Sequence, residues 1–330
     1  MKTILNRLIQ HEVLDKKESK EILYKIADGQ YNMSQISAFL TVYMMRSISV
    51  KELEGFRDAL LELCIHINLD EFDPIDLCGT GGDNKDTFNI STLASFVTAG
   101  AGIKVAKHGN YGVSSNCGSS NVMEYLGIKF SNDESFLKKC IEKAGICILH
   151  APLFHPAMKN VAPIRKELAV KTFFNMLGPM VNPSFPKNQI VGVFSLELAR
   201  IYGYLYQNSN KNFNIIHSLD GYDEISLTGS TKSISNIKEE IIEPIDFGLS
   251  ILKEKEIKGG DSIKSSAKIF MNVLSGKGTK AQNQVVCANS AIAIMTKMNI
   301  SPKEGYEKAK YSLISGKAMQ SLTHLQKLSS

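Results

Sequence analysis

The chain has 330 residues, of which 43% are hydrophobic and 22% charged, and its formal net charge is +5 at pH 7. This composition excludes a disordered chain, and the length allows a large core and two domains. The 38 lysines and arginines are dispersed, so an acidic substrate accounts for the positive charge and we predict no nucleic-acid partner. No apolar run approaches the roughly 20 residues that span a membrane, so we predict no membrane association.

The six cysteines show neither a CxxC pair nor the cysteine–histidine spacing of zinc sites. We therefore expect them to be buried thiols in a reducing compartment. Residues Met1 to His11 are expected to form a charged helix rather than a signal peptide. Together these features predict a cytoplasmic protein.

The first 70 residues are predicted to be helical. Each of three apolar periodic runs follows a capping box, in which two side chains three positions apart accept hydrogen bonds from each other's backbone. The three boxes pair Asp15 with Glu18, Asn32 with Gln35, and Ser49 with Glu52. We therefore predict a small all-α domain over residues 1–70.

After Asp73-Pro74 the pattern changes to short β-type runs that alternate with helices, which is typical of an α/β domain. The candidate strands are Ile75–Cys78, Ile103–Ala106, Ile146–Leu149, Gln189–Phe194 and Phe213–His217. The C-terminal part returns to helix, most clearly over Ser262–Val273 and Asn283–Met298. The predicted fold is a large α/β domain with a mostly parallel central sheet flanked by helices, plus the small all-α domain.

A glycine-rich loop, Gly79-Thr80-Gly81-Gly82-Asp83, follows the first predicted strand. Glycines let the backbone approach a ligand closely and turn successive N–H groups toward an anion, which suits phosphate or pyrophosphate. Asn89 to Thr92 then open an apolar helix, whose free N–H groups and positive dipole end face the same place. The loop is not a P-loop, because Asp83 stands where that motif needs lysine, and it lacks the third glycine of a dinucleotide fingerprint.

A second polar loop begins one helix later with Lys107-His108-Gly109-Asn110 and continues through Ser114–Ser119. Lys107 ends the strand-like run Ile103–Ala106 and is expected to bring a fixed positive charge to the pocket. Either loop alone is compatible with a simple strand–helix connection. Two of them around one helix predict a phosphate-binding site.

Acidic side chains cluster in Asp220-Gly221-Tyr222-Asp223-Glu224, after the run Phe213–His217. Magnesium takes one or two carboxylates and completes its shell with water and substrate phosphate oxygens. Taken alone, the cluster is better interpreted as an ordinary acidic turn. Beside a phosphate-binding loop that needs a counter-ion, a magnesium site is favoured.

These residues resemble those of the anthranilate phosphoribosyltransferase family. The resemblance covers nearly the whole chain, and its motifs keep the family's order and spacing. The motifs are CGTGGD (Cys78–Asp83), TFNIST (Thr87–Thr92), KHGN (Lys107–Asn110), SS-x-x-GS (Ser114–Ser119), EYLG (Glu124–Gly127), IRKEL (Ile164–Leu168), FNMLGPMVNP (Phe174–Pro183) and DGYDEISLTG (Asp220–Gly229).

The resemblance implies a pentosyltransferase of tryptophan biosynthesis. It would move the 5-phosphoribosyl group of phosphoribosyl pyrophosphate to the amine of anthranilate, giving N-(5-phosphoribosyl)anthranilate and pyrophosphate. The resemblance assigns catalysis to Lys107, Asp83 and Ser91. It assigns the donor to Gly79, Gly82, Asp83, Thr87, Asn89, Ile90, Ser91, Thr92, Lys107 and Ser119. It assigns anthranilate to Gly79, His108, Asn110 and Arg165, and two Mg²⁺ ions to Ser91, Asp223 and Glu224.

A domain arrangement is also implied by the resemblance. Residues 71–157 and 183–330 would form the donor-binding α/β domain, and a segment over about 158–182 would cross back onto the helical domain. Arg165 would then face the donor loops across a cleft, whereas the residues alone favour a surface helix arginine paired with Glu167 or with aspartates. The family implies a homodimer through the helical domain. The apolar residues Ile36, Phe39, Leu40, Tyr43 and Met44 could form that contact or only the helical core.

The chain departs from the family pattern in three places. Tyr111 stands where an arginine is common, Asn121 stands where an acid is common, and Leu168–Thr172 replaces a more usual LGVRT. None of these positions is assigned to catalysis. We therefore expect the departures to change affinity before they change the reaction.

Two other functions compete with this one. A pyrimidine nucleoside phosphorylase shares a Lys-His loop and a Gly-Ser loop, but it is expected to be longer and to have a different first glycine loop. A non-catalytic homologue that binds nucleic acid has no need for Asp83, Ser91, Asp223 and Glu224, and it needs a concentrated basic stripe that this chain lacks.

Overall fold

A computed structural model describes residues 1–112 and 117–330 of the chain. At its centre lies a seven-stranded sheet in the order β3-β2-β1-β4-β5-β6-β7. Neighbouring strands from β3 to β5 run parallel, and β6 and β7 add to one edge in antiparallel fashion. The strands are β1 (Ile75–Gly79), β2 (Val105–Gly109), β3 (Ile146–His150), β4 (Asn188–Gly192), β5 (Asn212–Ser218), β6 (Thr231–Ser235) and β7 (Glu239–Ile242). The mostly parallel α/β sheet is thus confirmed.

Two details of the strand prediction were wrong. The second strand begins later and runs further than predicted, because β2 pairs with β3 from Val105 to Gly109. Lys107 therefore lies inside a strand rather than after it. Strands β6 and β7 were not predicted at all, because their polar residues are held by antiparallel pairing, of β6 with β5 and of β7 with β6, rather than by an apolar pattern.

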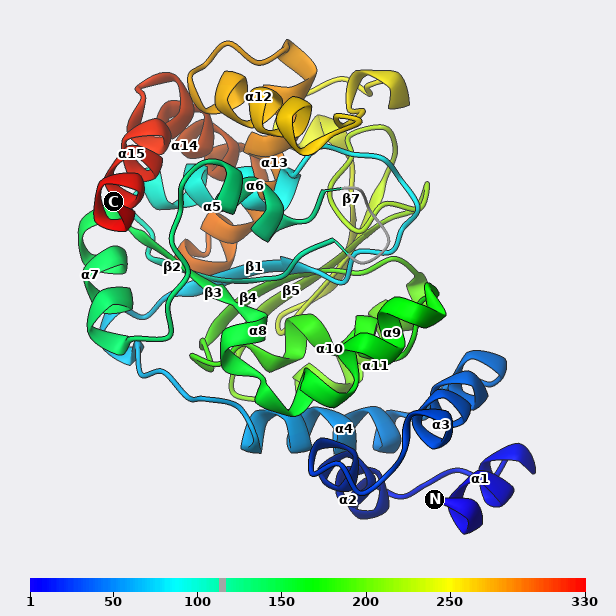
Figure 1. Ribbon diagram of the computed structural model, residues 1–330. Helices are drawn as coiled ribbons and strands as arrows, with labels where there is room; N and C mark the ends of the chain where they lie inside the picture. Colours follow the sequence, from blue (N-terminus) through cyan, green and yellow to red (C-terminus); the bar gives the residue numbers. More distant parts are fainter. Residues whose placement is uncertain (113–116) are drawn as a thin grey trace.

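Helices cover both faces of the sheet (Figure 1). One face carries α5 (Ile90–Gly100) and α13 (Lys280–Met298), and the opposite face carries the helices between β3 and β5. The remaining helices after β1 are α6 (Ser119–Tyr125), α7 (Glu134–Ala144), α8 (Ala151–Phe154), α9 (Ala162–Leu168), α10 (Phe174–Leu177), α11 (Leu196–Gln207), α12 (Ile263–Leu274), α14 (Pro302–Ile314) and α15 (Lys317–Ser329). The expected C-terminal helices are α12 and α13, with N-caps Ser262 and Thr279.

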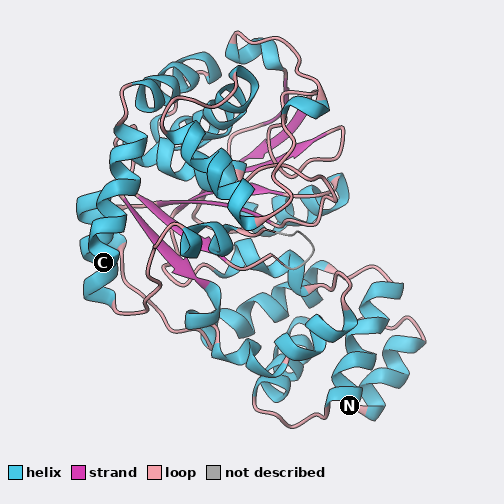
Figure 2. Cartoon of the chain, turned by 45° about the horizontal axis from the view of Figure 1, so that its top comes forward, coloured by secondary structure: helices cyan, strands magenta, loops and turns pink. Residues whose placement is uncertain are grey.

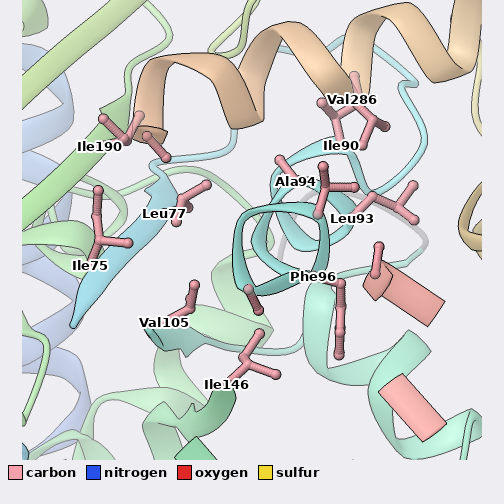
Figure 3. Packing of buried hydrophobic residues seen from close by; sticks show 14 of the residues in the cluster. Ile75, Leu77, Ile90, Leu93, Ala94, Phe96, Val105, Ile146, Ile190 and Val286 are labelled. Carbon is pink, nitrogen blue, oxygen red and sulfur yellow. The ribbon is translucent and has the colours of Figure 1, made fainter. Parts of the chain in front are cut away.

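The core of the α/β part lies between the sheet and α5. Branched side chains of four strands pack against α5 and α13, and this packing fixes the strand ends at which the polar loops begin (Figure 3). The residues are Ile75, Leu77, Val105, Ile146 and Ile190 from the strands, with Ile90, Leu93, Ala94, Phe96 and Val286 from the helices. Burial of such side chains contributes about 1.5–3 kcal/mol each.

The N-terminal helices form a separate unit to one side of the sheet (Figure 2). They are α1 (Lys2–Ile9), α2 (Lys16–Ala27), α3 (Met33–Met45) and α4 (Val50–Glu62). All three predicted capping boxes are confirmed, at Asp15, Asn32 and Ser49. Of the apolar residues on α3 that were open to two interpretations, Ile36, Phe39, Leu40 and Tyr43 are buried in this chain's own core, and only Met44 is exposed.

Phe173, from the segment between α9 and α10, inserts into the helical unit. Its ring stacks on Phe56 with centroids 4.5 Å apart, and it meets Tyr43 edge-on at 5.2 Å. Aromatic contacts of this kind add to the area buried. The segment that follows α9 is therefore anchored in the helical unit, and α9 itself also contacts α3 of that unit.

Two further expectations concerned the state of the cysteines and the presence of membrane-spanning segments. All six cysteines, each among the described residues, are free thiols, and Cys140, Cys147 and Cys287 are buried while the other three are half-buried. Within residues 1–112 and 117–330, no helix is both long and apolar enough to cross a membrane.

Candidate active site

The polar loops meet at the carboxyl ends of the strands, beside β1. The chain runs outward from β1 to β2 and β3 and then returns to place β4 on the other side of β1. Open α/β sheets bind ligands at such a reversal of strand order, because the loops on either side diverge and leave a crevice. Here the crevice has a volume of about 490 Å³.

This cleft brings together nearly all the predicted site residues. Its lining includes Gly79, Gly82, Asp83, Thr87, Asn89, Ser91, Thr92, Lys107, His108, Asn110, Ser119, Arg165, Asp223 and Glu224. Ile90 does not line it, because its side chain is fully buried in the core beneath α5 and its N–H donates to the carbonyl of Phe88. Ser114 and Ser115 of the SS-x-x-GS motif lie outside the described residues.

The glycine-rich loop after β1 holds the acidic segment that follows β5. The Gly81 N–H donates to Oδ2 of Asp223 at 2.7 Å. A Cβ atom on Gly79 would lie only 2.6 Å from the same oxygen. The absence of a side chain at Gly79 is thus what lets a carboxylate approach the end of β1.

The N-terminus of α5 holds the second carboxylate. The Ser91 N–H donates to Oε1 of Glu224 at 2.8 Å, so an otherwise free amide of the first helical turn is satisfied. Asn89, at the N-cap, turns its side chain away from the helix and donates from Nδ2 to the carbonyl of Cys117 at 3.1 Å. This hydrogen bond therefore joins the glycine-rich loop and the second polar loop at the N-terminus of α5.

Three carboxylates share this end of the cleft at an electrostatic cost. Burial, together with the charge of Asp83, raises the pKa of Asp223 to about 7. Burial also raises the pKa of Asp83, and burial with the charges of Asp223 and Asp83 raises that of Glu224 well above its usual range. A bound cation would relieve this repulsion.

The arrangement of the carboxylates is compatible with magnesium. One oxygen of Asp223 and one of Glu224 accept from backbone N–H groups, which leaves Oδ1 and Oε2 available to a cation, and Ser91 lines the same cleft. Among the described residues, no three His, Cys, Asp or Glu side chains are arranged as a metal site by themselves. Magnesium suits an incomplete set, because it keeps water and phosphate oxygens in its shell.

Lys107 supplies a buried positive charge next to these groups. It is 3% exposed, and its Nζ donates to the carbonyl of Leu77 on β1 at 2.6 Å. That contact explains how a lysine is tolerated within a parallel strand, where both faces are covered. The ammonium group still has two N–H groups that can donate hydrogen bonds to an anion in the cleft.

Arg165 lines the other side of the cleft, on α9. Its Nη2 donates to Oδ1 of Asn175 at 3.2 Å, and its guanidinium lies 5.5 Å from the ring of Phe174. Burial alone lowers its pKa to about 10, since no acidic side chain of the described residues contributes. Its buried Nε also has no hydrogen-bond partner within those residues. The alternative of a surface arginine paired with Glu167 is thereby excluded.

Two histidines lie close together, and one of them, His108, lines the same cleft as Arg165. Nδ1 of His108 is 3.1 Å from the carbonyl of Gly178, while its buried Nε2 has no partner in the described part of the chain. The ring of His155 is 5.3 Å from that of His108. Burial lowers the pKa of His108 to about 3 and that of His155 to about 4, so both rings are neutral near pH 7.

Comparison with known proteins agrees with this geometry. Residues 71–319 match the glycosyl transferase family α/β domain, and residues 2–64 match the helical bundle domain of the same family. An anthranilate phosphoribosyltransferase from Flavobacterium johnsoniae is 72% identical over 329 residues, which cover 100% of both chains. One from Christiangramia forsetii is 70% identical over 100% of this chain and 99% of its own. The chain belongs to the anthranilate phosphoribosyltransferase family.

Solved structures of the anthranilate phosphoribosyltransferase family show the same fold. The enzyme from Thermus thermophilus superposes with a TM-score of 0.90, at 30% identity over 98% of both chains. The enzyme from Saccharomyces cerevisiae, in complex with PRPP and Mg, also has a TM-score of 0.90, at 29% identity over 98% of this chain and 96% of its own. The expectation of a phosphoribosyltransferase rather than a nucleoside phosphorylase or a nucleic-acid binder is confirmed.

Two of the three departures from the anthranilate phosphoribosyltransferase pattern have local explanations. Oδ1 of Asn121 accepts hydrogen bonds from the N–H groups of Gly112 and Gly118, at 3.1 and 3.0 Å, and an aspartate there would accept the same two bonds. The ring of Tyr111 meets His150 edge-on, with centroids 4.8 Å apart. Tyr111 thus replaces a cation by an aromatic contact at the rim of the cleft.

Sequence reasoning gave no role to three residues that contact the site residues. Asn175 accepts from Arg165, His155 lies against His108, and Lys171 donates from Nζ to the carbonyl of Gly82. Asn175 stands in a motif that carries the resemblance, and Lys171 stands in the segment Leu168–Thr172 that departs from the family pattern. Their partners, however, lie on other elements, and only the fold brings them together.

Proposed function

We propose that the chain catalyses the magnesium-dependent transfer of the 5-phosphoribosyl group from phosphoribosyl pyrophosphate to anthranilate, a step of tryptophan biosynthesis. The proposal rests on the family membership and on one observation. On one side the cleft carries a half-buried guanidinium that has no acidic partner among the described residues, and on the other it carries glycine-loop amides with three carboxylates, of which Asp223 is buried. Such a cleft suits an organic carboxylate opposite a metal-bound pyrophosphate.

The donor is proposed to lie along the glycine-rich loop and the start of α5. Gly79, Gly82 and Asp83 would face the pyrophosphate from the loop, and Lys107 and Ser119 would face it from the second loop. Thr87, Asn89, Ser91 and Thr92 complete the donor site, and Ile90 would take part only through its backbone. Asp223, Glu224 and Ser91 would hold magnesium, as two ions, which when bound neutralises the leaving pyrophosphate.

Anthranilate is proposed to bind between Arg165 and the neighbouring histidines. The planar guanidinium of Arg165 matches a carboxylate in a two-point hydrogen bond. Gly79 and Asn110 would border the aromatic ring. His108 is neutral, and if Nδ1 donates to the carbonyl of Gly178, then Nε2 is left to accept from the amine of anthranilate.

In this reaction the bond from ribose C1 to the pyrophosphate oxygen breaks, and the amine nitrogen forms a bond to C1 and loses one proton. Positive charge builds on the ribose ring and negative charge on the leaving group. Lys107, Asp83 and Ser91 act at that end, where fixed charges and dipoles stabilise the transition state most. The amine is already a neutral nucleophile, so its orientation by Arg165 and His108 accounts for much of the remaining rate.

The decisive test follows the fluorescence of anthranilate in the presence of phosphoribosyl pyrophosphate and Mg²⁺, with and without a chelator. We expect a loss of fluorescence that requires the metal. If fluorescence is unchanged while calorimetry still detects donor binding, then the acceptor is another compound. If neither loss nor donor binding is detected, the proposed function is wrong.

The proposal includes the assembly and location of the chain. The domains would comprise residues 1–70 with the crossover segment 158–182, and residues 71–157 with 183–330, as the packing of Phe173 among helical-unit aromatics supports. A homodimer through the helical domain is supported by the exposure of Met44 (43%) and Met45 (80%) at the end of α3. Sedimentation should give a mass twice that of one chain, and the Met45→Asp variant should sediment with a lower mass.

A cytoplasmic location is also part of the proposal. It is supported by the free thiols.

A further inference from the structure

The turn between α9 and α10 contacts both sides of the cleft. α9 ends at Leu168, and its C-cap residue Ala169 has a left-handed φ of 53°. Beyond it, Oδ1 of Asn175 accepts two hydrogen bonds, one from Nη2 of Arg165 at 3.2 Å and one from the N–H of Thr172 at 3.1 Å. The position of the Arg165 guanidinium is therefore tied to the backbone of this turn.

Lys171, the residue before Thr172, extends from the turn to the donor loop. Its Nζ donates to the carbonyl of Gly82, and its Cε lies 3.2 Å from the point where a Cβ atom on Gly82 would sit. Gly82 has a φ of 80°, so the loop takes a conformation there that a side chain would strain. The ammonium group also lies 5.6 Å from the centre of the Phe194 ring, which holds the lysine stem in place.

Asp83, one of the three clustered carboxylates, directly follows Gly82. The positive charge of Lys171 lowers the pKa of Asp83 and so offsets part of the rise that burial causes. Hydrogen bonds thus link Arg165 to Asn175 and Asn175 to the backbone of Thr172, and the adjacent Lys171 continues this chain of contacts to Gly82. It joins groups that are 83 positions apart in the sequence, counted from Gly82 to Arg165.

We propose that Lys171 and Asn175 are positioning residues that couple the acceptor side of the cleft to the donor loop. The inference rests on the proposed function, which places a carboxylate at Arg165 and pyrophosphate at Gly82. A carboxylate that binds Arg165 orders Asn175 and the turn, and the ordered turn fixes Lys171 on Gly82. The second ligand then meets a loop that is already ordered, so each ligand tightens the binding of the other.

The coupling is measured with a pair of ligands that cannot react. Anthranilate is titrated by calorimetry with and without saturating Mg²⁺ and pyrophosphate, which lacks the phosphoribosyl group. For the wild-type chain we expect pyrophosphate to tighten anthranilate binding by about 10-fold, within the usual range of coupling between sites, and the reverse titration must give the same factor. Lys171→Met should lower the coupling factor to about 2 or less. Lys171→Arg keeps a hydrogen-bond donor for the carbonyl of Gly82 and should retain most of the coupling.

Two further variants make the test specific. Asn175→Ala breaks the same chain at its other end and should also lower the factor. Lys166→Met, which removes an exposed lysine beside Arg165 on α9, should leave it unchanged. An unchanged factor in Lys171→Met, or the absence of coupling in the wild-type chain when both ligands bind, would overturn the inference. If the wild-type chain binds neither ligand, the proposed function itself fails.

Discussion

The backbone carbonyl oxygen of Asp223 lies 1.6 Å from the point that a Cβ atom on Gly192 would occupy. No real Cβ atom approaches an oxygen so closely, so the acidic segment packs directly on the bare backbone at the end of β4. Gly79 at the end of β1 leaves similar room for the carboxylate of Asp223. Two strands without side chains at their carboxyl ends thus allow Asp223 and Glu224 to reach the start of α5.

Gly192→Ala should therefore displace the acidic segment. We expect kcat to fall by about 100-fold or more, because misplacing charged groups by an ångström removes several kcal/mol of electrostatic stabilisation. The Mg²⁺ concentration for half-maximal activity should rise as well. Steady-state assays over a range of Mg²⁺ concentrations measure both effects.

Gly229→Ala is the matched control for this variant. The three atoms nearest to a Cβ atom there would all belong to Asp220, at ordinary contact distances of 3.5 Å and more, and the residue lies in the segment between β5 and β6. Near wild-type activity is expected. Equal losses in both variants would show that the segment tolerates no added methyl group, and the specific role of Gly192 would be lost.

Arg165→Met should separate binding from stability. A lost charged hydrogen-bond pair to a carboxylate is worth about 1.5–3 kcal/mol, so the KM for anthranilate should rise by about 10- to 100-fold. The KM for the donor should change little. Because a buried cation without an acidic partner is costly to the folded chain, the melting temperature should stay level or rise.

Kinetics with each substrate varied in turn, together with thermal melts, test the Arg165 prediction. Lys166→Met is the control on the same helix. A rise confined to the KM of the donor would contradict the placing of the acceptor. A large drop in melting temperature would instead show that Arg165 supports the fold.

Much of this site could be read from the sequence because its residues are local to their motifs. Gly79, Asp83 and Ser91 lie within a dozen positions of each other, and their strand–loop–helix context fixes where they point. The capping boxes were found for the same reason, since a box needs only four residues. Parallel pairing then brings separate loops to one edge of the sheet without further information.

The remaining features depend on distant contacts. Whether Arg165 has an acidic partner is decided by what surrounds α9, and the residue's neighbours in the sequence wrongly suggested Glu167. Lys107 was predicted to end the run Ile103–Ala106, whereas it lies inside β2, where its Nζ donates to the carbonyl of Leu77 on a neighbouring strand. The contact of Lys171 with Gly82 likewise follows from the fold rather than from spacing.

The double variant Asp223→Asn with Glu224→Gln should lose activity but keep its fold. Both substitutions preserve shape and remove charge from a cluster in which burial and neighbouring charges raise the pKa values. We expect turnover to fall by about 100-fold or more, since the metal-bound leaving group is no longer stabilised. The metal-free variant should melt no lower than the metal-free wild-type chain, because like-charge repulsion is gone.

Mg²⁺ titrations read by thermal shift and by activity check the double variant. The wild-type chain should be stabilised by Mg²⁺ and the variant should not. Asp220→Asn, which changes a carboxylate bonded to Thr228 within the same segment, is the control. Unchanged turnover of the double variant at limiting Mg²⁺ would contradict the magnesium assignment.

His108 should make the fold sensitive to acid. Its pKa is lowered to about 3 by burial, against about 6.5 in the unfolded chain, so the unfolded state takes up a proton first as the pH falls. The stability that the neutral ring contributes is therefore present above pH 6.5 and is lost progressively toward pH 3. At pH 5 the loss of stability from this one group is about 2 kcal/mol.

The His108→Gln variant tests this prediction. Between pH 8 and pH 5 its free energy of unfolding should fall by about 2 kcal/mol less than that of the wild-type chain, as measured by urea unfolding at both pH values. His155 is present in both proteins, so its own titration cancels in the comparison. Equal losses in the two proteins would mean that His108 is accessible to protons in the folded state, and its role as a neutral acceptor beside Gly178 would then be untenable.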